Sequence, residues 1–115
     1  MKNLFKYISL FIVTLVLSGA TASADYQKGL DAYNTGDYAT ALREWRPIAD
    51  QGIASAQANL GFMYANGNGV PQDDVEAMKW YRLAADQGDA YAQFKLGSMY
   101  AEGEGVPLDP LVAMK

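Results

Sequence analysis

The feature that most constrains this 115-residue chain is an internal repeat with a period of 36 residues. Residues 53–79 and 89–115 are identical at 16 of 27 aligned positions, and both contain a G-x-G-V-P block. The same offset relates residues 49–52 to residues 85–88, which both read ADQG. A unit of this length cannot cover its own apolar face, so such units stack and each contacts only its neighbours. The repeat therefore predicts an elongated array built from one small structural unit.

Each unit is predicted to contain two antiparallel helices. Residues 54–66 form the first, because Ala56, Leu60, Met63 and Tyr64 recur at helical spacing on one face. Gly67 follows and can take the left-handed conformation that ends a helix. The resulting fold class is all-α.

The second helix of the unit is predicted from about residue 74 to residue 87. Asp73 is placed to cap its start, and Glu76 three residues later predicts a reciprocal capping box. The residues expected to point inward are mostly small, and Gly88 closes the helix. They are Ala77, Met78, Tyr81, Ala84 and Ala85.

The chain divides into four predicted segments: residues 1–24, a first unit at 25–52, a full unit at 53–88 and a shortened unit at 89–115. The first unit has a shorter turn, residues 34–38 (NTGDY), and is degenerate. The third ends partway through its second helix, whose cap is expected at Asp109. Leu96 and Tyr100 are therefore expected to lose part of their cover. A fragment of a longer repeat protein, a truncated gene and a partner that covers this end all remain open.

The full unit resembles the Sel-one-like repeat (SLR), a relative of the tetratricopeptide repeat; the first unit is more similar to an ordinary tetratricopeptide unit. The resemblance implies a short right-handed α-solenoid of antiparallel helix pairs, used as an adaptor or ligand-binding scaffold, often in exported bacterial proteins, and it implies no catalysis. The residues that carry it in the full unit are Ala56, Leu60, Gly61, Tyr64, Gly67, Gly69, Val70, Asp73, Ala77, Trp80, Tyr81, Ala84, Ala85 and Gly88. Their counterparts in the next unit include Leu96, Gly97 and Tyr100.

The first 24 residues are predicted to be a cleaved export signal. Lys2 and Lys6 precede an 11-residue apolar run at residues 7–17, and residues 22–24 (ASA) fit the A-x-A cleavage pattern. The run is too short to span a bilayer, which takes about 20 apolar residues. We expect cleavage after Ala24, a periplasmic or secreted protein, and no membrane association after cleavage.

Composition excludes several kinds of chemistry. Without Lys2 and Lys6, 7 of the 9 basic residues remain against 13 acidic ones, a net charge of −6, which argues against a nucleic-acid partner. The chain has no histidine and no cysteine, so the usual general base, thiolate nucleophiles and cysteine-ligated zinc are absent. We expect no metal, no cofactor and no catalytic residue.

The remaining enzymatic alternative is a cell-wall-active or penicillin-binding hydrolase, an activity linked to some cysteine-rich relatives of the repeat. Such an enzyme would need a nucleophilic Ser-x-x-Lys or G-x-S-x-G motif. Neither Ser55 nor Ser98 is followed by a lysine three residues later, and no G-x-S-x-G is present. The sequence favours a non-catalytic scaffold that binds another protein or peptide; its oligomeric state is left open.

Binding is expected on the concave face, which the first helix of each pair lines in such solenoids. Exposed aromatic residues on that face would anchor a peptide or a partner helix. The outward positions, counted from the leucine-glycine pair, are Tyr26, Tyr33, Asn34, Ser55, Ala58, Phe62, Asn66, Tyr91, Phe94, Ser98 and Glu102. Trp80, Tyr64 and Tyr100 are predicted to belong to the core.

Overall fold

The computed structural model describes residues 23–104, and this range contains five α-helices and no strand. They are α2 (Tyr26–Asn34), α3 (Tyr38–Asp50), α4 (Ala54–Asn66), α5 (Asp74–Asp86) and α6 (Ala90–Glu102). Residues 1–22 of the predicted export signal and the helix start predicted at Asp109 lie outside the described residues. Within residues 23–104, no helix is long and apolar enough to cross a membrane.

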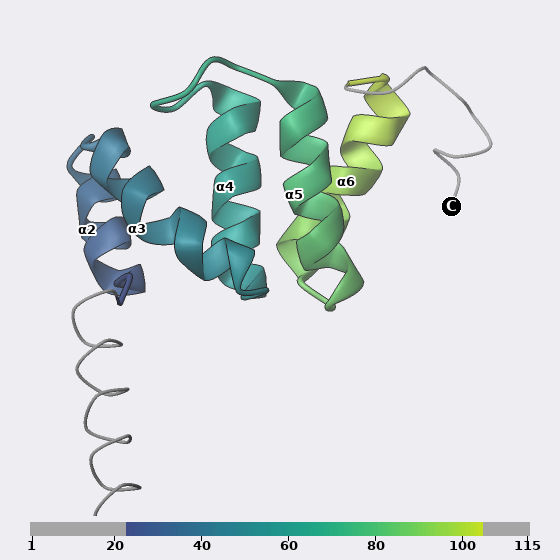
Figure 1. Cartoon of the computed structure of the whole chain (residues 1–115). Helices are drawn as coiled ribbons and strands as arrows, with labels where there is room; N and C mark the ends of the chain where they lie inside the picture. The colour runs from purple at the N-terminus through teal and green to yellow at the C-terminus, as the bar shows by residue number, and fades with distance from the viewer. Residues whose placement is uncertain (1–22, 105–115) are drawn as a thin grey trace, which may run out of the picture.

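The helices stack in chain order (Figure 1). Each packs against the next, and α4 and α6, the first helices of successive units, also touch. Because every helix contacts mainly its sequence neighbours, the array is a solenoid and has no single central core. The predicted all-α solenoid is confirmed.

The helix ends follow from local chemistry. The bounds predicted for the first helix of the full unit, residues 54–66, agree with α4, and Gly67 ends it at a left-handed φ of 69°. Asp37, Asp73 and Asp89 each cap a helix by accepting a backbone N–H. α5 ends at Asp86, one residue before the predicted end, and is followed by Gly88 at a φ of 94°.

The predicted capping box at the start of α5 forms only in part. The Asp73 carboxylate accepts the backbone N–H of Glu76 at 3.0 Å, as expected. The Asp73 N–H, however, donates to the carbonyl of Tyr64 at 2.9 Å, so the Glu76 carboxylate is not needed there. That carboxylate lies 3.8 Å from the Lys79 ammonium. The reciprocal half of the box was wrong, because the loop brings the end of α4 close to the start of α5.

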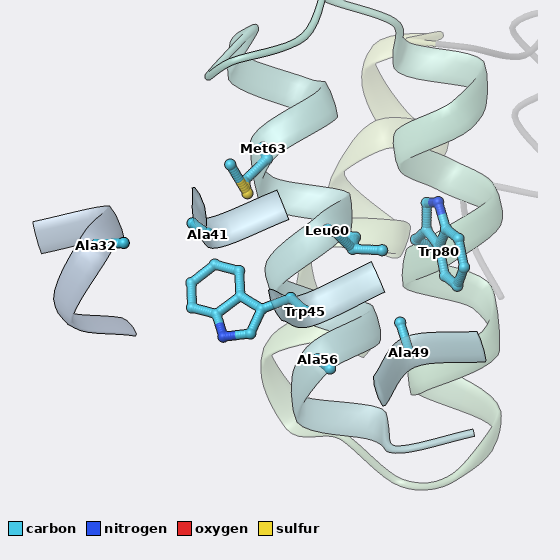
Figure 2. Close-up of a cluster of buried hydrophobic side chains, with 8 residues drawn as sticks. All are labelled: Ala32, Ala41, Trp45, Ala49, Ala56, Leu60, Met63 and Trp80. Carbon is cyan, nitrogen blue, oxygen red and sulfur yellow. The ribbon is translucent and has the colours of Figure 1, made fainter. Parts of the chain in front are cut away.

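Two small cores hold the stack together, and both combine alanines with a few large side chains. The first joins α2, α3, α4 and α5 around Trp45, Leu60 and Met63 (Figure 2). The second joins α4, α5 and α6 around Met78, Tyr81 and Met99. Alanines let the helix backbones approach closely, and the large side chains fill the space between them.

Aromatic rings lie on glycines where paired helices cross. A Cβ on Gly29 of α2 would lie 2.4 Å from Nε1 of Trp45 on α3, and a Cβ on Gly61 of α4 would lie 2.7 Å from Cδ1 of Tyr81 on α5. Real Cβ atoms essentially never lie so close to another atom, so any larger residue at either position would displace the ring. The same contact thus joins the two helices in both of the pairs that the structure describes in full.

Some of the predicted repeat residues are buried, and others are half-buried or exposed. Ala56, Leu60, Gly61, Ala77, Trp80 and Tyr81 are buried, as expected. Tyr64 is only half-buried, and its hydroxyl lies 2.6 Å from an amino group of Arg46 that donates to it. Leu96 and Tyr100 are half-buried too, and Gly97 is exposed. Tyr64 and Tyr100 therefore lie at the margin of the core and not within it.

Candidate functional site

Three aromatic side chains from the first helices of the three units lie in a row. The ring of Tyr33 on α2 lies 6.1 Å from that of Phe62 on α4, which lies 6.5 Å from that of Tyr91 on α6. All three belong to the predicted binding residues. We call Tyr33, Phe62 and Tyr91 the aromatic row. Tyr91 is 45% exposed, so one end of the row is open to a partner.

A cavity of about 160 Å³ lies at the α2 end of the aromatic row. Its lining is mainly aromatic and aliphatic, with two side-chain amides. A cavity of this kind suits an apolar side chain accompanied by a hydrogen-bonding group. The lining residues are Leu30, Tyr33, Asn34, Trp45, Asn59 and Phe62.

Neighbouring groups hold the rings of this site in place. Trp45 stacks on Tyr33 with 5.9 Å between ring centroids, and the Asn68 amide donates to the Tyr33 hydroxyl at 3.0 Å. The Asn59 amide donates to the Tyr26 hydroxyl, also at 3.0 Å. Burial raises the pKa of Tyr33 above its ordinary 10.0, so this hydroxyl is neutral at physiological pH. The cavity therefore offers a fixed and uncharged aromatic wall.

The other predicted binding residues lie apart from this cavity. Ser55 is exposed, the Asn66 amide donates to the backbone carbonyl of Phe62 at 2.8 Å, and the Ser98 hydroxyl lies 3.3 Å from the carboxylate of Glu102. Asn66 instead lines a separate, polar hollow of about 170 Å³ that also contains Lys95. The structure thus groups Tyr26, Tyr33, Asn34, Phe62 and Tyr91, and it does not bring the more C-terminal polar residues to them.

The predicted outward position of Ala58 was wrong. It was expected to point outward, but it is only 6% exposed and packs with Ala77 and Tyr81 of α5. Phe94 is the residue 36 positions later and is 71% exposed. Position counting placed both on the concave face, whereas the position of Ala58 faces the second helix of its own unit.

Sequence reasoning missed Leu30, Asn59 and Asn68. Leu30 follows Gly29 as Phe62 follows Gly61, so aligning the glycines of the first two units would have found it. No sequence signal marks Asn59 or Asn68, because their partners Tyr26 and Tyr33 are 33 and 35 residues away.

A larger and more open groove of about 570 Å³ crosses α3 and the loop that precedes α5. It contains none of the predicted binding residues. Its lining mixes two guanidinium groups with one carboxylate and three apolar side chains, so it carries no strong charge preference. The lining residues are Leu42, Arg43, Arg46, Pro47, Asp50 and Val70.

The described residues contain no group of three or more acidic side chains that could hold a metal ion. Among the described residues, Tyr81 has the most strongly raised pKa. The main cause is its burial against α4, and the neighbouring Tyr91 hydroxyl raises the pKa further. A buried phenol that stays protonated is a packing group and not a base. Tyr81 therefore contributes to the packing between α4 and α5.

Stacked antiparallel helix pairs, each packed on the next, define an α-solenoid repeat protein. More particularly, the chain belongs to the Sel1 repeat family, whose model matches residues 54–89 and 90–115. Sel1 repeats generally serve as scaffolds for protein–protein interaction. The earlier resemblance is confirmed.

Two solved structures show the same fold. One is a protective antigen present in uropathogenic Escherichia coli strains and displays an SLR fold, with 43% identity and a TM-score of 0.71 over 76% of this chain. The other is a Sel1 repeat protein from Oxalobacter formigenes, with 42% identity and a TM-score of 0.63 over 66% of this chain. This chain spans about a fifth of each, 20% and 22% respectively. No curated protein matches it.

Proposed function

We propose that the protein is an exported, non-catalytic scaffold that binds another protein or peptide along its concave face. The observation that carries the proposal is the aromatic row, in which the rings of three successive first helices follow one another at 6.1 Å (Tyr33 to Phe62) and 6.5 Å (Phe62 to Tyr91). Aromatic side chains held rigidly on a scaffold are efficient anchors, because they bury a large area and lose little conformational entropy.

The ligand class follows from the chemistry of the row. The cavity beside it is lined by three aromatic rings, one leucine and two amides. Such a lining favours an apolar side chain of a peptide, with the Asn34 and Asn59 amides as donors or acceptors for its backbone. It contains no basic residue that would select a phosphate or a carboxylate.

The contacts of Asp25 support export with cleavage after Ala24. The Asp25 side chain caps α2, and its backbone nitrogen donates to the Glu44 carboxylate at 2.9 Å. Cleavage after Ala24 would turn that nitrogen into an ammonium group beside the same carboxylate, while the cap would remain. A mature chain that begins at Asp25 therefore keeps the first helix intact.

A capture experiment with matched variants tests the binding proposal. The tagged protein is cross-linked in periplasmic extract, and recovered partners are quantified for the wild type, Phe62→Ala and Tyr91→Ala. Truncating a central anchor should reduce recovery of a specific partner by about tenfold or more. Val75→Ala is the control, because Val75 is an exposed apolar residue on α5. Recovery that is equal for all four proteins would refute concave-face binding.

Two measurements test the remaining parts of the proposal. N-terminal sequencing of the exported protein should begin at Asp25, and a chain that starts at Met1 in the membrane fraction would contradict export with cleavage. The alternative, a penicillin-binding hydrolase, predicts covalent labelling by a fluorescent penicillin. A labelled band would overturn the non-catalytic proposal.

A further inference from the structure

The groove that crosses α3 holds opposite charges beside apolar side chains. Its volume of about 570 Å³ lies within the usual range for sites that bind small ligands. Arg43 and Arg46 are about one helical turn apart, and Asp50 follows Arg46 by one further turn. The groove as a whole has little charge preference, but the charge changes sign along it. The apolar lining residues are Leu42, Pro47 and Val70.

Within residues 23–104, none of these three charges is neutralised by an ion pair, because the ion pairs of this range all lie outside the groove. Arg43 donates to the hydroxyl of Thr40 at 2.9 Å, and Arg46 donates to the hydroxyl of Tyr64, so both guanidinium groups have uncharged partners. Arg46 and Asp50 have the four-residue spacing at which ion pairs form on a helix, yet no such pair joins them. Two positive groups and one negative group are therefore available to a ligand.

The equivalent positions of α5 show that the open charge is particular to α3. Lys79 lies 36 residues after Arg43, and its ammonium group is 3.8 Å from the carboxylate of Glu76. The counterpart of Glu76 on α3 is Thr40, which carries no charge. The first unit thus lacks the carboxylate that pairs with the basic residue of the second unit. The guanidinium of Arg43 remains open to a ligand for this reason.

The G-x-G-V-P block fixes the apolar wall that Val70 contributes to the groove. The loop between α4 and α5 reaches back toward α3 (Figure 1), and a Cβ on Gly69 would lie 2.6 Å from the Cβ of Tyr38. In the same loop, the amide of Asn68 donates to the hydroxyl of Tyr33 at 3.0 Å. The loop is therefore anchored to both α2 and α3, and it holds Val70 beside the charged face of α3.

We propose that this groove binds a short peptide of about three residues whose two termini are both free. The peptide carboxylate contacts Arg43 and Arg46, the peptide ammonium contacts Asp50, and apolar side chains of the peptide pack on the apolar lining. The length follows from the helix, because Arg43 and Asp50 are separated by about 10 Å along α3, which an extended peptide spans in about three residues. Guanidinium groups suit a carboxylate because they form charge-assisted hydrogen bonds with it.

This groove shares no lining residue with the aromatic row or its cavity. The proposal therefore does not depend on binding at the concave face, and each can fail without the other.

Titration with the tripeptide Leu-Ala-Leu tests the proposal. Binding to the purified, ¹⁵N-labelled protein is followed by changes in amide chemical shifts, and we expect saturable changes on α3 and at Val70. Acetylation of the peptide's N-terminus or amidation of its C-terminus should each weaken binding by about tenfold, because each removes a hydrogen bond to a charged group. Absence of saturable binding overturns the proposal. Equal affinities for the free peptide and the peptide blocked at both ends would overturn it as well.

Charge variants assign each terminus of the peptide. Asp50→Asn should weaken binding of the free peptide by about tenfold and leave that of the acetylated peptide unchanged, and Arg43→Gln should act in the same way toward the amidated peptide. Arg82→Gln is the control, because Arg82 lies 36 residues after Arg46 and outside the groove. All of these side chains are exposed, so each variant should keep the wild-type Tm. Equal weakening of free and blocked peptides would refute the assignment. Binding that is lost in Phe62→Ala but kept in Arg43→Gln would place the peptide on the aromatic row and refute a site on α3.

Discussion

The ring of Tyr81 lies directly on the backbone of α4 at Gly61, so that a Cβ there would come within 2.7 Å of Cδ1. Gly61→Ala therefore forces a buried ring to move, and overpacking of this kind typically destabilises by about 1–3 kcal/mol. We expect a lower midpoint of urea unfolding. Gly97→Ala is the matched control, and it should instead stabilise by up to about 1 kcal/mol, because it adds helix propensity in open space. Equal effects at the two glycines would contradict the packing described.

Among residues 23–104, Leu60 is the largest aliphatic side chain that is fully buried, and it connects α4 to the first core. Leu60→Ala should lower the free energy of unfolding by about 2–5 kcal/mol, because it leaves a cavity among Trp45, Met63 and Trp80. In so short an array we expect loss of the cooperative transition in circular dichroism. Leu83→Ala, at an exposed leucine on α5, should leave the transition nearly unchanged. If Leu60→Ala unfolded cooperatively and with the stability of the wild type, the role of Leu60 in the first core would be refuted.

Tyr81 makes stability depend on alkaline pH. Burial raises its pKa above the ordinary 10.0, so above that pH the folded state holds a proton that the unfolded state loses. Its contribution is complete below about pH 10 and decreases as the pH rises further. Tyr81→Phe should reduce this decrease in stability with pH. The variant should keep its stability at pH 7, because the buried hydroxyl lies near Tyr91 without a well-formed hydrogen bond. Urea midpoints between pH 8 and 11 measure the effect. A Tyr81→Phe variant whose urea midpoint declined with pH as steeply as that of the wild type would count against this account.

Asp37 makes the stability of the fold decrease at acid pH, whereas Tyr81 makes it decrease at alkaline pH. Its carboxylate accepts from the hydroxyl and the backbone N–H of Thr40 at 2.7 and 3.2 Å, which holds its pKa below the ordinary 3.8. The folded state therefore releases this proton more readily than the unfolded state, and stability decreases as the pH falls below about 4. Asp37→Asn keeps a capping oxygen but removes the charge, so its Tm should change less between pH 2 and 6. If the Tm of the variant and that of the wild type decreased equally between pH 6 and 2, Asp37 would not contribute to the acid sensitivity of the fold.

Local features could be predicted because they depend on neighbouring residues. Helical spacing, the left-handed Gly67 and the aspartate caps act within a few residues, and the bounds of α4 followed from them. The 36-residue repeat further predicted stacking, because each unit leaves an apolar face that only another unit can cover. The membership of the Sel1 repeat family follows from the same residues.

The direction of individual side chains could not be predicted in the same way. Ala58 and Phe94 occupy equivalent repeat positions, yet one is buried against α5 and the other is exposed, because only the first has a second helix over it in the described chain. The Asp73 N–H could not be assigned to Tyr64 either, since that bond depends on the path of the loop.

The sequence by itself determined the helices, their caps and the repeated unit, because these are local or periodic properties. The aromatic row was decided only by the tertiary structure. Tyr33, Phe62 and Tyr91 are each 29 residues apart, not 36, so they are not equivalent positions of the repeat. They meet because α2, α4 and α6 come together in the solenoid, and this depends on packing between residues that are far apart in the sequence.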